Sequence, residues 1–303
     1  MKKNLFLTII LNILLIIVLI FVLDFLFVYY KNNSHIIKNG FRLLPESEAL
    51  KIEKARDTVS GPANVNPQQG KRPVVFSGCS IAYGLFLPFE ETIGYLVSQK
   101  TGRKAYNRGR SSTCISHVLY ELTNSKVYDE MEQPEYMFFI YDPFLHAMRT
   151  NTFVYSATSQ TEYLFYRLKD GRLNVGHAIP FLSSFSLFRH ICFEINHNNP
   201  FTEYNKALTV KIFEEVNNKI HKIFPDIHFI VIVYEGNFND IDYHNPFFKD
   251  ILKALEDKGI EVISVSQMLG DNPNQEKYKA DPAHPSAYVW EKVSEKLAEK
   301  YNL

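Results

Sequence analysis

The sequence predicts an α/β fold, a three-layer sandwich in which helices cover both faces of a central parallel sheet of about five strands. Two observations predict this fold. Short apolar runs bounded by turn residues alternate with longer amphipathic segments, and the runs are almost continuously apolar, as is typical of strands buried on both faces. The 303 residues suffice for one sizeable domain or two small ones. The 33 basic and 33 acidic side chains balance, so the charge gives no sign of a nucleic-acid partner.

Five apolar runs are expected to form the sheet. In chain order they are Arg72–Ser77, Lys104–Tyr106, Tyr136–Tyr141, Ile227–Tyr234 and Ile260–Ser264. Each is short and ends at turn-forming or polar residues, which favours a buried parallel strand.

Amphipathic segments between and after these runs are expected to be helices. They are Glu91–Lys100, Cys114–Thr123, Thr202–Phe224, Pro246–Lys258 and Pro285–Tyr301. In the longest of them apolar residues recur at helical spacing until Pro225 stops the helix, and Gly259 is the expected C-cap residue of the next one.

The aromatic-rich segment 145–200 does not fit this alternation and is expected to be an insertion or lid. Within it, the run from Tyr166 to Val175 predicts a hairpin, because Asp170-Gly171 is a favoured two-residue turn.

The N-terminus predicts a membrane anchor. From Asn4 to Tyr30 the chain is almost continuously apolar, which exceeds the ~20 residues needed to cross a bilayer. A cleaved signal peptide is not expected, because its apolar core would be only ~7–15 residues long and a small-residue cleavage site would follow it. No such site follows this run. Lys2 and Lys3 favour a cytoplasmic N-terminus, which places the rest of the chain outside the cytoplasm of a single-pass protein.

The sequence thus divides into an anchor over residues 1–30, a linker over 31–70 and a globular domain over 71–303. The stretch from Gly61 to Gly70 is rich in turn and linker residues. For an extracytoplasmic domain, one disulfide among Cys79, Cys114 and Cys192 is possible, and the alternative is a set of buried thiols.

Candidate site residues follow the carboxyl ends of the expected strands. Ser80, Gly109 and Asp142 each come just after such a strand, and parallel strands gather their sites at this edge. Near the C-terminus, Asp281 precedes His284 by three residues. A serine, a histidine to take its proton and a carboxylate to orient the histidine form a Ser-His-Asp triad.

Three motifs together resemble the SGNH, or GDSL-like, hydrolase superfamily over residues 71–303. They are Gly78-Cys79-Ser80, Asn107-Arg-Gly109 and the Asp281-x-x-His284 segment. The resemblance implies a flavodoxin-like sheet, with Ser80 as nucleophile, His284 as base and Asp281 as its orienting acid. It also implies that the amides of Ser80 and Gly109 form an oxyanion hole, to which Asn107 is a further candidate.

The motifs also depart from the family. Cys79 replaces the usual aspartate, and it is not expected to be the nucleophile, because neighbouring residues in a strand or turn point apart. Asp142 follows the third strand where the family usually offers an asparagine donor, and an ionised aspartate only accepts hydrogen bonds. Asp142 and His146 are therefore candidates for substrate binding. The histidines show no metal-binding spacing, so neither a metal nor another cofactor is expected.

The resulting expectation is a membrane-anchored serine esterase that acts on ester groups, chiefly O-acetyl groups, of cell-envelope glycans or lipids. Three alternatives stay open, and one of them is a cytoplasmic orientation of the domain with lipid-derived esters as substrate. The same triad serves an O-acyltransferase that modifies an envelope polysaccharide, and the missing asparagine is compatible with a non-catalytic binding protein. The sequence predicts no particular protein partner.

Overall fold

The computed structural model describes residues 12, 15–26, 70–110, 113–124, 128, 131–143, 146, 164–177, 201–235, 246–271, 275–281 and 284–303. Its centre is a five-stranded sheet with the strand order β2-β1-β3-β6-β7. All neighbouring strands pair in parallel. The strands are β1 (Val74–Gly78), β2 (Ala105–Asn107), β3 (Tyr136–Tyr141), β6 (His228–Val233) and β7 (Glu261–Ser264). The parallel sheet of five strands is confirmed, and its order is the flavodoxin-like one.

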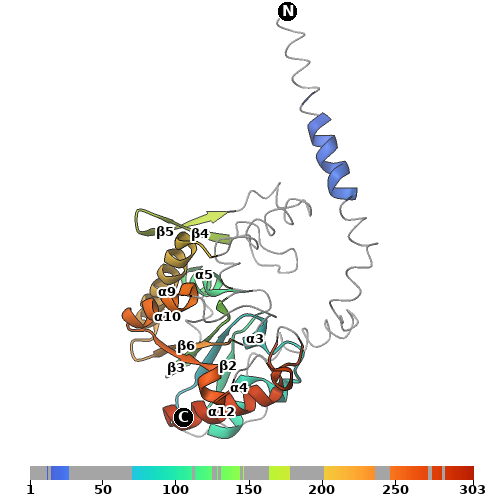
Figure 1. The fold of residues 1–303 in the computed structure, drawn as a ribbon. Coiled ribbons are helices and arrows are strands. Elements are labelled where there is room, and N and C mark those ends of the chain that lie inside the picture. The colour runs from blue at the N-terminus through green and yellow to red at the C-terminus, as the bar shows by residue number, and fades with distance from the viewer. Residues whose placement is uncertain are drawn as a thin grey trace, which may run out of the picture.

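Helices cover both faces of the sheet (Figure 1). One face packs against α5 (Ile115–Asn124), α9 (Glu203–Ile223) and α10 (Pro246–Asp257). The other packs against α3 (Ser80–Tyr83), α4 (Ile93–Thr101) and α12 (Ala287–Tyr301). Shorter elements are η2 (Phe89–Glu91), α11 (Val265–Leu269) and η3 (Glu276–Tyr278).

Strand β3 shows how the two cores arise from one apolar run. Phe139 and Tyr141 belong to the core under α9, whereas Phe138 and Ile140 belong to the core on the α12 side. Because successive side chains of a strand point to opposite faces, a strand covered on both sides must be apolar at every position. All four side chains are fully buried.

Helix ends differ from the predicted ones where a local interaction intervenes. The last helix starts at Ala287 instead of Pro285, because Pro285 pairs with Lys279 in an antiparallel bridge and Ser286 takes the N-cap position. Thr202 is the N-cap of α9 and accepts a hydrogen bond from the Asn205 amide at 3.1 Å. Gly259 follows α10 with a φ of +75°, as expected of a glycine that ends a helix.

The predicted hairpin is present as a separate two-stranded sheet. Strands β4 (Leu164–Lys169) and β5 (Arg172–His177) are antiparallel, and the turn residues Asp170 and Gly171 have φ angles of +50° and +71°. The hairpin packs beside α9, where the Leu168 amide donates to the Tyr204 hydroxyl at 3.0 Å (Figure 1). The remainder of the expected insertion lies mostly outside the described residues.

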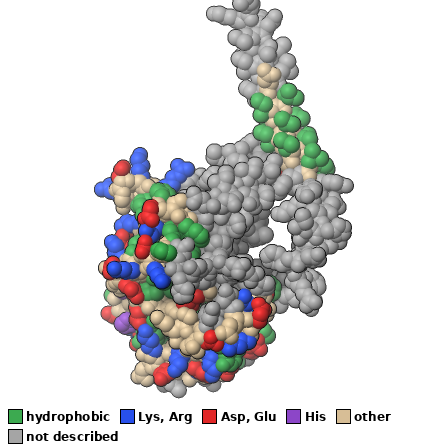
Figure 2. Space-filling model, in the orientation of Figure 1, with side chains coloured by type: hydrophobic (Ala, Val, Ile, Leu, Met, Phe, Trp, Pro, Cys, Tyr) green, Lys and Arg blue, Asp and Glu red, His purple; other side chains and the backbone are tan. Residues whose placement is uncertain are grey.

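Little of the expected anchor and linker lies within the described residues. Residues 15–26 are helical, and their large apolar side chains, such as Leu15 and Phe25, are exposed (Figure 2). Within the described ranges, no helix has the length and apolarity needed to cross a membrane. The linker, apart from Gly70, falls outside these ranges.

Cys79 and Cys114 are buried thiols, 0% and 1% exposed. Burial blocks attack by a solvent reagent, so both are expected to resist a thiol-specific reagent such as Ellman's reagent in the native protein and to react once guanidinium unfolds it. Peptide mapping after alkylation distinguishes them from Cys192, which lies outside the described residues. Rapid native labelling of Cys79 or Cys114 would contradict their burial.

Candidate active site

Ser80 is positioned by a sharp turn at the end of β1. Gly78, the last residue of β1, has a φ of +143°, and a Cβ there would lie 2.6 Å from the Ile140 carbonyl oxygen. Only glycine fits this close approach. Cys79 follows as the N-cap of α3 and is fully buried within the core on the α12 side, and Ser80 opens the helix. The turn therefore presents Ser80 at the carboxyl edge of the sheet.

Hydrogen bonds from the backbone hold Asp281 and His284 in place. The His284 amide donates to Asp281 Oδ1 at 2.8 Å, and the Ala280 amide donates to the His284 carbonyl at 2.9 Å. The Ser286 amide donates to the Tyr278 carbonyl at 2.8 Å, next to the Lys279–Pro285 bridge. The three-residue spacing thus allows one carboxylate to bind both the backbone and the side chain of the histidine.

The fold brings these two distant segments together. Ser80 Oγ lies 2.9 Å from His284 Nε2, and His284 Nδ1 lies 2.9 Å from both carboxylate oxygens of Asp281. An ionised carboxylate only accepts, so Nδ1 carries the hydrogen and Nε2 is left as the acceptor for the Ser80 hydroxyl. Ser80 is 6% exposed, and the side chains of His284 and Asp281 are 12% and 27% exposed. This geometry can activate a serine for attack on a carbonyl carbon.

The Asn107–Gly109 segment lies directly against the helix that carries Ser80. A Cβ on Gly109 would be 2.3 Å from the Tyr83 nitrogen and 2.6 Å from the Ala82 carbonyl carbon. Asn107 Nδ2 donates to the Ala82 carbonyl at 3.0 Å, and the Gly109 amide donates to Asn107 Oδ1 at 2.9 Å. Asn107 therefore holds α3 against the loop that follows β2. Sequence reasoning missed this role, because the role arises only when two loops meet in the folded chain.

These contacts bear on the oxyanion hole expected from the sequence. The amide of Ser80 opens α3, so it has no acceptor within that helix. The Gly109 amide, however, already donates to Asn107, and an oxyanion would have to share or replace that bond. The side-chain NH₂ of Asn107 donates to Ala82, so it is not aimed at a ligand in this structure.

Gly109→Ala is expected to be destabilising and to impair any reaction at Ser80. The added methyl group would overlap the backbone of α3, and relieving the overlap must move that helix. Overpacking of this kind costs about 1–3 kcal/mol. Urea unfolding would measure the cost. Gly94→Ala is the matched control, because Gly94, like Gly109, has no positive φ, and a Cβ there meets its nearest neighbour, the Asn107 Cβ, at an ordinary 3.5 Å. An equal loss of stability in both variants would contradict the close contact.

Asp142 and His146, expected as substrate-binding residues, are both fully buried. The His146 ring packs edge-on against Phe139 and Tyr141, with ring centroids 5.4 Å and 5.0 Å apart, on the side of the sheet that faces α9. Neither side chain has exposed surface to offer a substrate in this structure.

Tyr234 is a buried tyrosine that was not singled out from the sequence. Burial, and then the charges of Asp142 and Asp281, raise the pKa of the Tyr234 hydroxyl well above its usual range. The hydroxyl thus lies within electrostatic reach of both carboxylates. In the sequence Tyr234 is only the last aromatic residue of an apolar strand, so no signal marked it.

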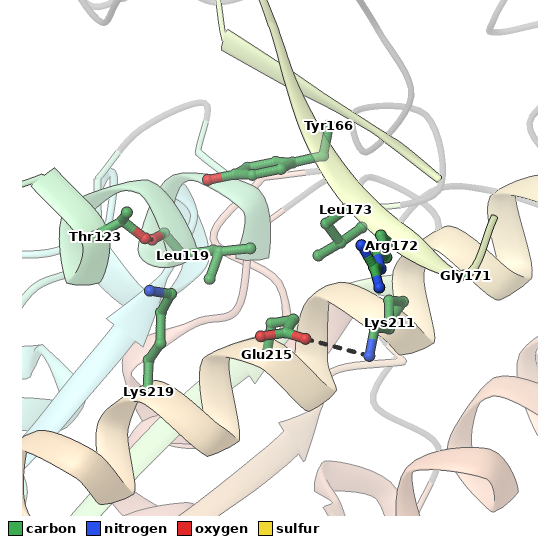
Figure 3. A pocket seen from close by; sticks show the side chains of 9 residues that line it. All are labelled: Leu119, Thr123, Tyr166, Gly171, Arg172, Leu173, Lys211, Glu215 and Lys219. Carbon is green, nitrogen blue, oxygen red and sulfur yellow. Dashed lines mark hydrogen bonds and ion pairs between the residues drawn. The ribbon is translucent and has the colours of Figure 1, made fainter. Parts of the chain in front are cut away.

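A separate groove of about 330 Å³ lies between α5, α9 and the β4–β5 hairpin (Figure 3). Leu119, Tyr166 and Leu173 form its apolar part, and Lys211 pairs with Glu215 at 3.2 Å along its edge. None of its lining residues belongs to the Ser80–His284–Asp281 set. Across the described ranges, no group of three or more His, Cys, Asp or Glu side chains is arranged to hold a metal ion.

Comparison with known proteins finds similarity at the level of structure. No family model and no curated protein matches the sequence. Among solved structures, a member of the lipolytic protein G-D-S-L family from Veillonella parvula matches with 14% identity and a TM-score of 0.43, over 76% of this chain and 98% of that one.

Two carbohydrate esterases are also similar. An acetyl xylan esterase from Butyrivibrio proteoclasticus has 10% identity and a TM-score of 0.45, over 76% of this chain and 63% of that one. A family two carbohydrate esterase from Clostridium thermocellum, in complex with cellohexaose, has 12% identity and a TM-score of 0.45, over 78% and 66%. Because the identities are below 25% and the TM-scores below 0.5, the function proposed below rests on the chain's own residues.

Proposed function

We propose that this chain is a serine esterase of SGNH type, with Ser80 as nucleophile, His284 as general base and acid, and Asp281 as its orienting acid. The observation that supports it is the continuous set of hydrogen bonds from Ser80 Oγ through the imidazole to the carboxylate. All three distances are 2.9 Å, which is within hydrogen-bonding range, and the one from Ser80 Oγ to His284 Nε2 permits proton transfer. The motifs that resemble the superfamily supply the same three residues.

The reaction follows from the protonation pattern. As Ser80 Oγ attacks the ester carbonyl, its proton passes to His284 Nε2, and Asp281 stabilises the imidazolium that forms. When the tetrahedral intermediate collapses, Nε2 gives that proton to the departing alcohol and an acyl group stays on Ser80. A water molecule then attacks the acyl carbon, gives a proton to Nε2, and the serine leaves with that proton, which completes ester hydrolysis.

The substrate proposed is an acylated, chiefly O-acetylated, glycan or lipid of the cell envelope. The support is the apolar run from Asn4 to Tyr30, which would tether the domain at a membrane surface. We also propose that the domain lies outside the cytoplasm, because Lys2 and Lys3 precede the run. Protease treatment of intact spheroplasts tests this: digestion of the domain without lysis is expected, and protection until lysis would refute it.

A non-catalytic binding protein is the competing function, and two observations favour it. The Gly109 amide is engaged by Asn107, and Asp142 stands where the family usually has an asparagine donor. Both would weaken stabilisation of an oxyanion, for which a single donor is worth about 3–4 kcal/mol.

Labelling with a fluorophosphonate probe separates the two functions. The probe phosphonylates only an activated serine, so esterase function predicts stoichiometric labelling of the full-length chain, and peptide mapping should find the modification on Ser80. Ser286→Ala should label as the wild type does, because Ser286 lies in the same loop region but outside the triad. A folded wild-type protein that leaves Ser80 unmodified would favour the binding protein.

A further inference from the structure

Phe86 has a backbone conformation that its side chain disfavours. In the described ranges three non-glycine residues have a positive φ: Asp170 at +50°, Asn302 at +48° and Phe86 at +68°. Aspartate and asparagine tolerate this left-handed region, whereas a bulky aromatic residue there is an outlier. Strain of this kind persists where the surrounding structure enforces it, and it is found preferentially at functional sites.

The structure around Phe86 enforces this conformation. The Leu85 amide donates to the Ser80 carbonyl at 3.0 Å, and the Leu87 amide donates to the Gly84 carbonyl at 3.1 Å. Leu87 is buried in the core on the α12 side. The backbone on both sides of Phe86 is thus fixed to the helix that carries the nucleophile.

The side chain of Phe86 stays partly exposed in spite of this strain. It is 37% exposed, while its ring meets the His284 imidazole edge-on, with centroids 5.2 Å apart and an interplanar angle of 74°. A phenylalanine that served only the core would be expected to lie inside it. Phe86 instead presents a partly open aromatic surface beside the base.

The chemistry of acyl transfer shows what occupies the space beside this imidazole. His284 Nε2 takes the proton of Ser80 Oγ when the serine attacks, and it gives that proton to the alcohol oxygen when the alcohol leaves. The alcohol part of the ester must therefore lie next to the imidazole. The acyl substituent and the oxyanion take the other directions around the tetrahedral carbon. By microscopic reversibility, any alcohol that accepts the acyl group approaches from the same side.

We infer that Phe86 is a specificity-determining residue that contacts the alcohol part of the ester, and that this part is a sugar ring. This inference rests on the proposed esterase function. The apolar C–H face of a sugar packs well on an aromatic surface, whereas a short alkyl alcohol covers little of it. Phe86 is thus expected to favour an acetylated sugar over a simple alkyl acetate.

Phe86→Gly is the most informative variant, because glycine adopts a φ of +68° without strain. The ratio of kcat/KM for an acetylated methyl glucoside to that for ethyl acetate is expected to fall about tenfold, the size of a lost apolar contact. The ratio for 4-nitrophenyl acetate to 4-nitrophenyl butyrate should change less than twofold. Tyr204→Leu removes a similarly exposed aromatic from α9, 41% exposed, and should change neither ratio.

Thermal unfolding separates this role from a packing role. Relief of the strain is expected to offset most of the contact that the ring loses, so the melting temperature of Phe86→Gly should stay near that of the wild type, whereas loss of a fully buried aromatic side chain would lower it markedly. An unchanged sugar-to-alkyl ratio, or a change in the acyl ratio instead, would overturn the inference.

Labelling of Ser80 by the fluorophosphonate identifies which proposal has failed. If Ser80 is labelled in the wild type and in Phe86→Gly but the sugar-to-alkyl ratio is unchanged, only the role of Phe86 is refuted. If the wild type shows neither labelling nor turnover, the esterase function fails, and the role of Phe86 fails with it.

Discussion

Ser80→Ala is expected to lower the rate of 4-nitrophenyl acetate hydrolysis by about 10⁴-fold or more, the loss seen when a triad nucleophile is removed. The variant keeps His284 and Asp281 in place but has no oxygen at the end of the hydrogen-bonded series. Without a covalent route, hydrolysis can proceed only by direct attack of water. Initial rates at saturating ester, compared with the buffer reaction, measure the loss.

The fold should survive this substitution. Ser80 is a small, almost fully buried side chain, and the substitution removes one oxygen that is hydrogen-bonded to His284. Loss of such a bond costs about 1 kcal/mol, so circular dichroism and the urea midpoint should stay near those of the wild type. Ser286→Ala is the matched control for activity and should alter the rate less than tenfold. A Ser80→Ala protein that is folded and retains wild-type turnover would end the assignment of the nucleophile.

The sheet could be predicted because its physical requirements leave a continuous mark on the sequence. A strand such as Tyr136–Tyr141 packs against helices on both faces, so each of its positions must be apolar or aromatic. Strand order does not leave such a mark, and here it came from the resemblance to a family. The sequence predicts the start of the last helix two residues before Ala287, because it cannot show that Pro285 forms a bridge with Lys279.

The candidate site was predictable where its geometry is local. Asp281 and His284 are three residues apart, and the bonds between them close within a single loop. Ser80 could be predicted to lie near them because it follows the carboxyl end of a strand, and sites in parallel sheets form at that edge. The backbone strain of Phe86 and the contact of Asn107 with α3 could not be found in this way, although Asn107 stands in one of the motifs that resemble the family. The φ of Phe86 and the bonds of Asn107 to α3 arise only when separate segments meet, and neither residue type signals such a role.

Asp281→Asn is expected to lower kcat by about 10⁴-fold while leaving the loop nearly intact. The reason lies in how the two carboxylate oxygens are used. Oδ1 accepts the hydrogen bond from the His284 amide at 2.8 Å, so an asparagine at this position must keep its oxygen there to preserve the turn. Its NH₂ group then replaces Oδ2, 2.9 Å from His284 Nδ1. The one remaining oxygen, which also lies 2.9 Å from Nδ1, is already occupied by the His284 amide.

An NH₂ group donates, so it would face the unprotonated form of Nδ1 and move the imidazole hydrogen to Nε2. That nitrogen could no longer accept the proton of Ser80, and the imidazolium would also lose its neighbouring negative charge. Steady-state kinetics would measure the loss, and the rate of fluorophosphonate labelling should fall in parallel, because it depends on the same activation of Ser80.

Asp271→Asn is the matched control: Asp271 binds the Tyr278 hydroxyl at 3.0 Å, outside the triad, so its loss should change kcat less than tenfold. If Asp281→Asn also stayed within tenfold of the wild type, the imidazole would be oriented by some other group, and the role of Asp281 would be limited to shaping the turn.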